Sequence, residues 1–99
     1  MNNEQRRPEG QLKINLTPDT AKGSYSNLAM VGHSPNEFII DYIFAAPGMP
    51  EAPVVSRIIL APETAKQLMF ALTDNVQKYE ARFGEIHQKQ NGMPPIGNN

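Results

Sequence analysis

Four polar side chains in the middle of the sequence have types that could do chemistry. They are His33, Glu37, Asp41 and Arg57, whose residue types serve as acids, bases or charged contacts in enzyme sites. No second acid, base or nucleophile accompanies the pair Asp41 and Arg57 along the chain. The residue types therefore favour a structural ion pair, and an enzyme site built across subunits around His33, Glu37, Asp41 and Arg57 stays open as an alternative.

Other catalytic and cofactor-binding classes lack their characteristic residues. The chain has no cysteine, which excludes disulfides, thiolate metal sites and thiol catalysis. Its two histidines, His33 and His87, are far apart and have no carboxylate cluster beside them, so we expect no metal site. The serines lack a nucleophile elbow, and no glycine-rich segment precedes a lysine as in a phosphate-binding loop. The sequence therefore predicts a protein that is not an enzyme and holds no cofactor.

The elements that position these side chains are strands followed by one helix. Leu12, Ile14 and Leu16 alternate with polar residues, and three further apolar runs are bounded by glycine or proline. The predicted strands are residues 12–16, 24–31, 37–44 and 54–60. Apolar residues then recur at spacings of three and four between Pro62 and Gly84, which predicts a helix of about 22 residues. We therefore expect an α+β fold: a four-stranded, mainly antiparallel sheet, and one long C-terminal amphipathic helix packed on one face.

Turn positions predict how the strands pair. Ser34 to Glu37 fits a type I turn, which would make a hairpin whose paired residue numbers sum to 71. A second hairpin closed about the proline-rich loop gives pairs that sum to 98. Asp41 then lies opposite Arg57, as a cross-strand pair of opposite charges. The same register predicts Ile43 opposite Val55, and Phe44 opposite Val54.

Both faces of the last two strands are apolar, although one helix can cover only one of them. The other face must meet another surface, because exposing it would leave a large apolar patch. A second copy of the chain is the simplest cover, so we expect a homodimer. The residues of this face are Leu28, Met30, Ile39, Ile43, Val55 and Ile59.

Composition limits the organisation and the partners. We expect one domain over residues 11–84, a disordered N-terminal tail over 1–10 and a disordered C-terminal tail over 85–99, because both tails are polar and rich in Asn, Gln, Gly or Pro.

Lys and Arg number 9 against 10 for Asp and Glu, so no basic field attracts nucleic acid. No apolar run is long enough to span a membrane or resembles a secretion segment, which predicts a cytoplasmic protein. Met49, on the stiff loop Pro47-Gly48-Met49-Pro50, is a candidate contact for a partner or another subunit.

The central motifs resemble a known family. YSNLAMVGHSPNEFIIDYIF, followed by PGMPEAPVVSRIILAPETAKQL, is similar to the prokaryotic domain-of-unknown-function family 3467, over about residues 12–83. Tyr42, where Phe is usual, and Ala61, where Ser or Thr is frequent, depart from the family pattern. The resemblance implies kinship and fold but no activity. A looser likeness, in layout only, is to the export chaperone SecB. The matching residues are Tyr25, Asn27, His33, Ser34, Pro35, Glu37, Phe38, Asp41, Pro47, Gly48, Pro50, Ser56, Arg57, Ile58, Pro62, Glu63, Ala65 and Lys66.

The leading functional hypothesis is therefore a small assembly or protein-binding module that self-associates through its sheet, with an unknown protein partner. One alternative is a chaperone of the SecB kind that binds extended apolar peptides. The other is the enzyme with an inter-subunit site described above.

Overall fold

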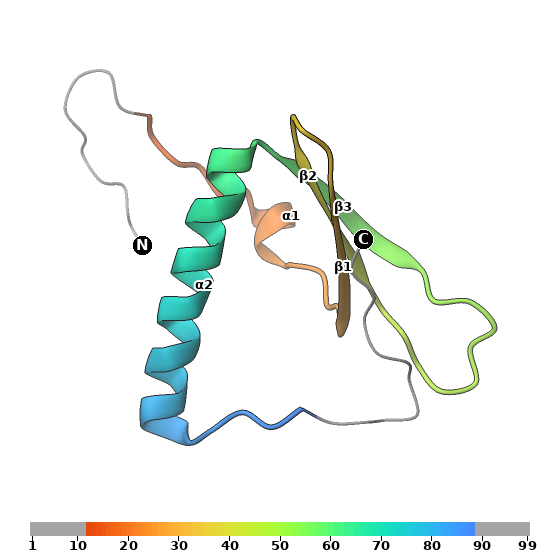
Figure 1. The fold of residues 1–99 in the computed structure, drawn as a ribbon. Helices are drawn as coiled ribbons and strands as arrows, with labels where there is room; N and C mark the ends of the chain where they lie inside the picture. The colour runs from red at the N-terminus through yellow and green to blue at the C-terminus, as the bar shows by residue number, and fades with distance from the viewer. Residues whose placement is uncertain (1–11, 89–99) are drawn as a thin grey trace.

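The computed structural model describes residues 12–88 and has the predicted α+β class. The predicted tail 1–10 and most of the tail 85–99 lie outside the described residues, so the prediction that they are disordered remains a prediction. Five elements follow one another along the chain (Figure 1): α1 (Pro18–Ala21), β1 (Leu28–His33), β2 (Phe38–Ile43), β3 (Val54–Leu60) and α2 (Pro62–Phe83).

Within residues 12–88 the sheet has three antiparallel strands in the order β1-β2-β3, so the prediction of a strand at residues 12–16, and with it of four strands, is wrong. Residues 12–16 form no strand within the described chain, and Ile14 is 78% exposed. An alternating pattern gives a preference for extended backbone, but a strand also needs a neighbouring edge that accepts its hydrogen bonds. Among the strands of the described residues, no edge pairs with this segment.

The predicted register is confirmed over most of the sheet. Every β1–β2 pair sums to 71, and the β2–β3 pairs sum to 98 as far as Tyr42 opposite Ser56. There the register shifts, because a β-bulge places Ile43 opposite Val54. The predicted pairs of Ile43 with Val55 and of Phe44 with Val54 are therefore wrong, and the extra residue in β3 lets the Phe44 amide donate to the Pro53 carbonyl at 3.1 Å.

Asn27 closes the sheet beyond the end of β2. Its Nδ2 donates to the Ala45 carbonyl at 2.8 Å, and the Ala45 amide donates to its Oδ1 at 2.9 Å. The side-chain amide thus replaces a backbone partner where the ladder has ended. Tyr25, two residues earlier, places its ring edge against Phe44 with centroids 6.1 Å apart. The chain before β1 is therefore held against the segment that leaves β2.

We expect Asn27→Ala to lower the free energy of unfolding by about 1 kcal/mol, because two exposed hydrogen bonds are lost. Asn27→Asp is the matched variant, since it keeps the acceptor for the Ala45 amide but has no donor for the Ala45 carbonyl. Asn27→Asp should therefore lower the free energy of unfolding by less than Asn27→Ala does. Urea unfolding at fixed protein concentration measures both, and equal losses for the two variants would contradict the paired arrangement.

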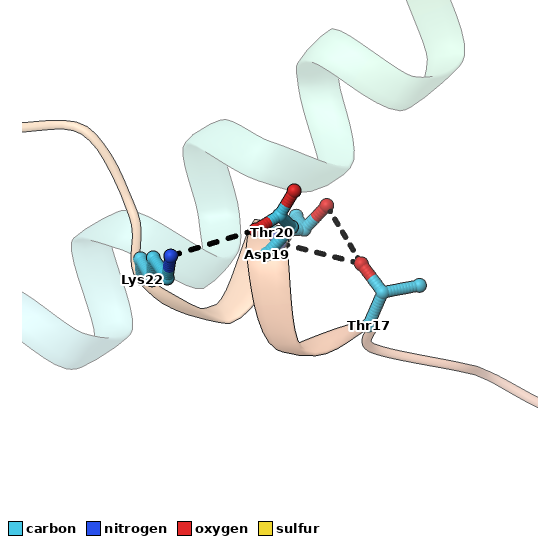
Figure 2. Close-up of polar contacts among 4 residues, drawn as sticks. All are labelled: Thr17, Asp19, Thr20 and Lys22. Atoms are coloured by element: carbon cyan, nitrogen blue, oxygen red, sulfur yellow. Dashed lines mark hydrogen bonds and ion pairs between the residues drawn. The ribbon is translucent and has the colours of Figure 1, made fainter.

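The short helix α1 is capped by a threonine (Figure 2). The Thr17 hydroxyl accepts from the Thr20 amide at 3.3 Å and donates to the Thr20 hydroxyl at 3.1 Å. Lys22 lies 3.5 Å from the Asp19 carboxylate at the other end. Threonine at the N-cap and proline at the first helical position both suit the start of a helix, so this sequence favours the observed helical turn.

The long helix α2 begins and ends where the sequence predicts. Pro62 occupies its first turn, and Gly84 ends it with a φ of 101°, a conformation that favours glycine. Ala61 stands at the N-cap and makes no side-chain capping bond, as expected for alanine. Its 22 residues carry the predicted apolar stripe, defined as Ala65, Leu68, Met69, Leu72, Val76, Tyr79 and Phe83.

The helix does not cover a face of the sheet within one chain, which corrects the predicted packing. In Figure 1, α2 starts at the end of β3 and then runs down apart from the strands. No residue of α2 is buried, and Leu72 in the middle of the stripe is 58% exposed. Among residues 12–88, the one buried hydrophobic side chain is Ile43, at 7% exposure. The periodicity correctly predicts an apolar helix face, but within residues 12–88 this face stays largely exposed.

Candidate functional site

The strongest polar contact in the sheet joins Asp41 of β2 to Arg57 of β3. Arg57 Nε donates to Asp41 Oδ1 at 2.6 Å, and Nη2 donates to Oδ2 at 2.8 Å. This two-point geometry matches the planar guanidinium to the carboxylate and fixes both side chains. The register places the two residues directly opposite each other, as predicted.

The pair lies on a sheet face that is open in the single chain. The Asp41 side chain is 18% exposed and the Arg57 side chain is 60% exposed. The hydrogen bonds from Arg57 lower the pKa of Asp41 below its ordinary value, burial opposes this, and attraction to the guanidinium charge adds to it. The same contact raises the pKa of Arg57, which stays charged.

The pair should contribute to stability only where Asp41 is ionised. Because its pKa is lowered in the folded chain, the contribution is full above the unfolded value of about 3.9. It is lost as the pH falls through the lowered folded value. Wild type should therefore exceed Asp41→Asn in stability at pH 6, and the difference should vanish in strong acid.

Urea unfolding across this pH range measures that difference. As a control, the carboxyl of Asp41 can be titrated by NMR in wild type and in Arg57→Gln, where its pKa should rise toward the ordinary value. The same pKa in both proteins would contradict the two hydrogen bonds.

Three of the five candidate residues meet at one hollow of about 160 Å³. His33, Asp41 and Arg57 all line it, so the structure brings together residues that are up to 24 positions apart in the sequence. Two residues of the apolar part of this wall, Met30 and Ile39, belong to the apolar face predicted from the sequence. The other lining residues are Met30, Val31, Gly32 and Ile39.

His33 and Glu37 flank the turn between β1 and β2. The His33 ring lies 5.5 Å from that of Phe38, its cross-strand partner. Glu37 contributes its backbone to the turn, where its carbonyl accepts from the Ser34 amide at 2.9 Å. Its side chain does not line the hollow. Glu37 therefore has a structural role, through its backbone carbonyl in the turn.

Met49 lies on the loop between β2 and β3, apart from the hollow. Its amide donates to the Ala46 carbonyl at 3.2 Å, and Gly48 before it has a φ of 85°. The Met49 side chain is 40% exposed. A tight turn thus presents an apolar side chain outward, and whether it contacts a partner remains a prediction.

The arrangement offers ionic and hydrogen-bonding contacts but no assembled acid–base pair. Asp41 is engaged by Arg57, and no group of three His, Cys, Asp or Glu side chains suited to a metal occurs among residues 12–88. The guanidinium retains donors that Asp41 does not use, since it has five N–H groups. The pair can therefore fix the orientation of two strands and offer a donor to whatever covers this face.

These features define a small α+β protein with a three-stranded sheet, a long amphipathic helix and one cross-strand ion pair. The chain belongs to the family described as Protein of unknown function (DUF3467), whose model matches residues 1–88. The comparisons with curated proteins and with solved structures found no match, so they give no support to the likeness to SecB. None of the helices within residues 12–88 combines the length and the apolar character needed to cross a membrane.

Proposed function

We propose that this protein is a non-enzymatic assembly module. It forms a homodimer through its sheet, and the dimer binds a protein partner. The observation that carries the proposal is the burial pattern: Ile43 is the one buried hydrophobic side chain among residues 12–88. A domain normally folds around a core that removes much of its apolar surface from water. A second copy supplies the missing half of that core.

The surface to be covered is named the ion-pair face. Residues directly opposite each other in antiparallel strands point to the same side, so the register defines this face without reference to the bulge. Its charges are Asp41 and Arg57, which bind each other, and it is otherwise apolar. Its members are Leu28, Met30, Ile39, Asp41, Ile43, Arg57 and Ile59, of which Ile43 is already buried within the single chain.

Composition supports the rest of the proposal. The net charge of −1 offers no field for nucleic acid, so the partner we propose is a protein. The absence of cysteine suits a reducing compartment, and a cytoplasmic location is part of the proposal. The non-enzymatic assignment rests on Asp41, the best-placed carboxylate, being held by Arg57.

The test is the dependence of stability on protein concentration. A dimer that unfolds to separate chains gains stability as its concentration rises, whereas a monomer does not. We therefore expect the urea midpoint to rise across a hundredfold concentration series. A midpoint that stays constant would contradict self-association.

A thermal-shift screen separates the two alternatives from this proposal. Stabilisation by a metabolite or metal ion would favour an enzyme site around His33, Glu37, Asp41 and Arg57. Stabilisation by unfolded apolar peptides would favour a chaperone. The assembly module predicts no response to either set, because its apolar surface is already covered by the second copy.

A further inference from the structure

The stripe of α2 is the second large apolar surface that the chain leaves uncovered. A hollow of about 390 Å³ lies over its middle, and the described residues that line it are mostly apolar. Leu72 in this lining is 58% exposed. An amphipathic helix owes most of its stability to packing of its apolar face, so a 22-residue helix without buried residues lacks its main support. The lining consists of Met69, Leu72, Thr73, Val76 and Gln77.

The stripe and the ion-pair face match in chemistry. The stripe carries no charged residue, and the ion-pair face carries one negative and one positive charge that are bound to each other. A helix laid on this face therefore meets no unpaired charge. A bound pair tolerates partial desolvation far better than a lone charge.

The area of the two surfaces suits a stable dimer. Aromatic side chains bury about 150–250 Å² each when covered, and Tyr79 and Phe83 are more than half exposed. With the aliphatic side chains of both surfaces, the apolar area is on the order of 600–800 Å² per copy, near the ~800 Å² per partner of a standard interface. The aliphatic contributors are Leu68, Met69, Leu72, Met30 and Ile59.

We propose that the two copies exchange their helices, so that the stripe of each α2 packs on the ion-pair face of the other copy. This inference rests on the proposed dimer and states which surfaces meet in it. A twofold axis makes the same helix–sheet contact twice, so one pair of surfaces covers the stripe and one face of the sheet in each copy. One connecting residue, Ala61, joins β3 to α2, and the helix leaves the strands directly after it.

The absence of natural cysteine makes cross-linking a direct test. Leu72→Cys and Ile59→Cys chains, distinguished by tags of different length, are refolded together and oxidised, and a second sample receives a short bis-maleimide. Each chain has one thiol, so every cross-link joins two copies. We expect mixed dimers joining Leu72→Cys to Ile59→Cys.

Gln67→Cys, on the opposite side of α2, is the matched control. Its mixed product with Ile59→Cys should be at least about tenfold less abundant, because disulfides require Cα atoms within about 7 Å. Unchanged circular dichroism and unchanged dimer mass of the reduced variants show that they fold. A second pair, Met69→Cys with Met30→Cys, repeats the test at another point of the two surfaces.

Each outcome bears on a different statement. A dimer with mixed cross-links supports helix exchange. A dimer whose links join only Leu72→Cys to itself, or only Ile59→Cys to itself, overturns helix exchange and leaves the dimer standing. Absence of a dimer in the unmodified chain overturns the proposed function as well.

Discussion

Leu72→Glu should turn the proposed dimer into a monomer. Leu72 is 58% exposed in the single chain, so the substitution adds no buried charge there, and glutamate suits a helix. In the dimer its carboxylate would be covered without a partner, which costs about 3–5 kcal/mol. At 1.4 kcal/mol per tenfold, the dissociation constant should rise more than about 100-fold. Sedimentation velocity over a concentration series measures this shift.

The control is Gln67→Glu, which adds the same charge to the same helix on the side away from the stripe. It should leave the dissociation constant within about threefold of wild type, since exposed surface substitutions change free energies by about 0.5 kcal/mol or less. If both variants dissociate alike, net charge explains the effect and the stripe does not. If neither dissociates, the stripe is outside the interface.

Ile43→Ala should cause the largest loss of stability among the strand side chains. Ile43 is 7% exposed and lies at the bulge, where β1, β2 and β3 come together. Truncating a buried isoleucine to alanine costs about 2–5 kcal/mol, and truncation to valine about 0.5–1.5 kcal/mol. Urea unfolding at fixed protein concentration should show this graded order.

Ile14→Ala serves as the control, because the same side chain is 78% exposed there. Its effect should stay within about 0.5 kcal/mol of wild type. A loss at Ile14 equal to the loss at Ile43 would mean that residues 12–16 are covered in the folded protein. A negligible loss at Ile43 would show that the sheet has no core at this position.

Local patterns predict the elements that follow from short-range physics. Two elements match their predicted ranges, the helix Pro62–Phe83 and the strand Val54–Leu60. Proline, glycine and the spacing of the apolar residues fix their ends. β1 begins four residues later than predicted and includes Gly32 and His33, since pairing with β2 decides its ends. The bulge after Tyr42 depends on side-chain packing between strands. A register derived from the symmetry of the loop takes no account of that packing.

Contacts between elements explain the larger errors. Residues 12–16 alternate as a strand does, but alternation does not identify the edge that would accept them. The stripe of α2 is correctly placed, yet periodicity states that a helix has an apolar face without stating which surface covers it. A chain whose core is shared between copies looks, in its sequence, like one that buries the same face within itself.

The candidate site was predictable where it depends on register alone. Asp41 meets Arg57 because two hairpin turns fix the pairing. Residue type alone points to Glu37 and Met49, and the structure places both away from the hollow. Only the family resemblance points to Asn27, because its role depends on where the ladder ends near Ala45.

Sedimentation equilibrium of the unmodified chain tests the central claim, that one copy lacks a core and a second copy completes it. At micromolar concentration we expect a species of twice the 11.0 kDa chain mass, dissociating only on strong dilution. A single 11.0 kDa species at every concentration, with cooperative unfolding, would contradict the account.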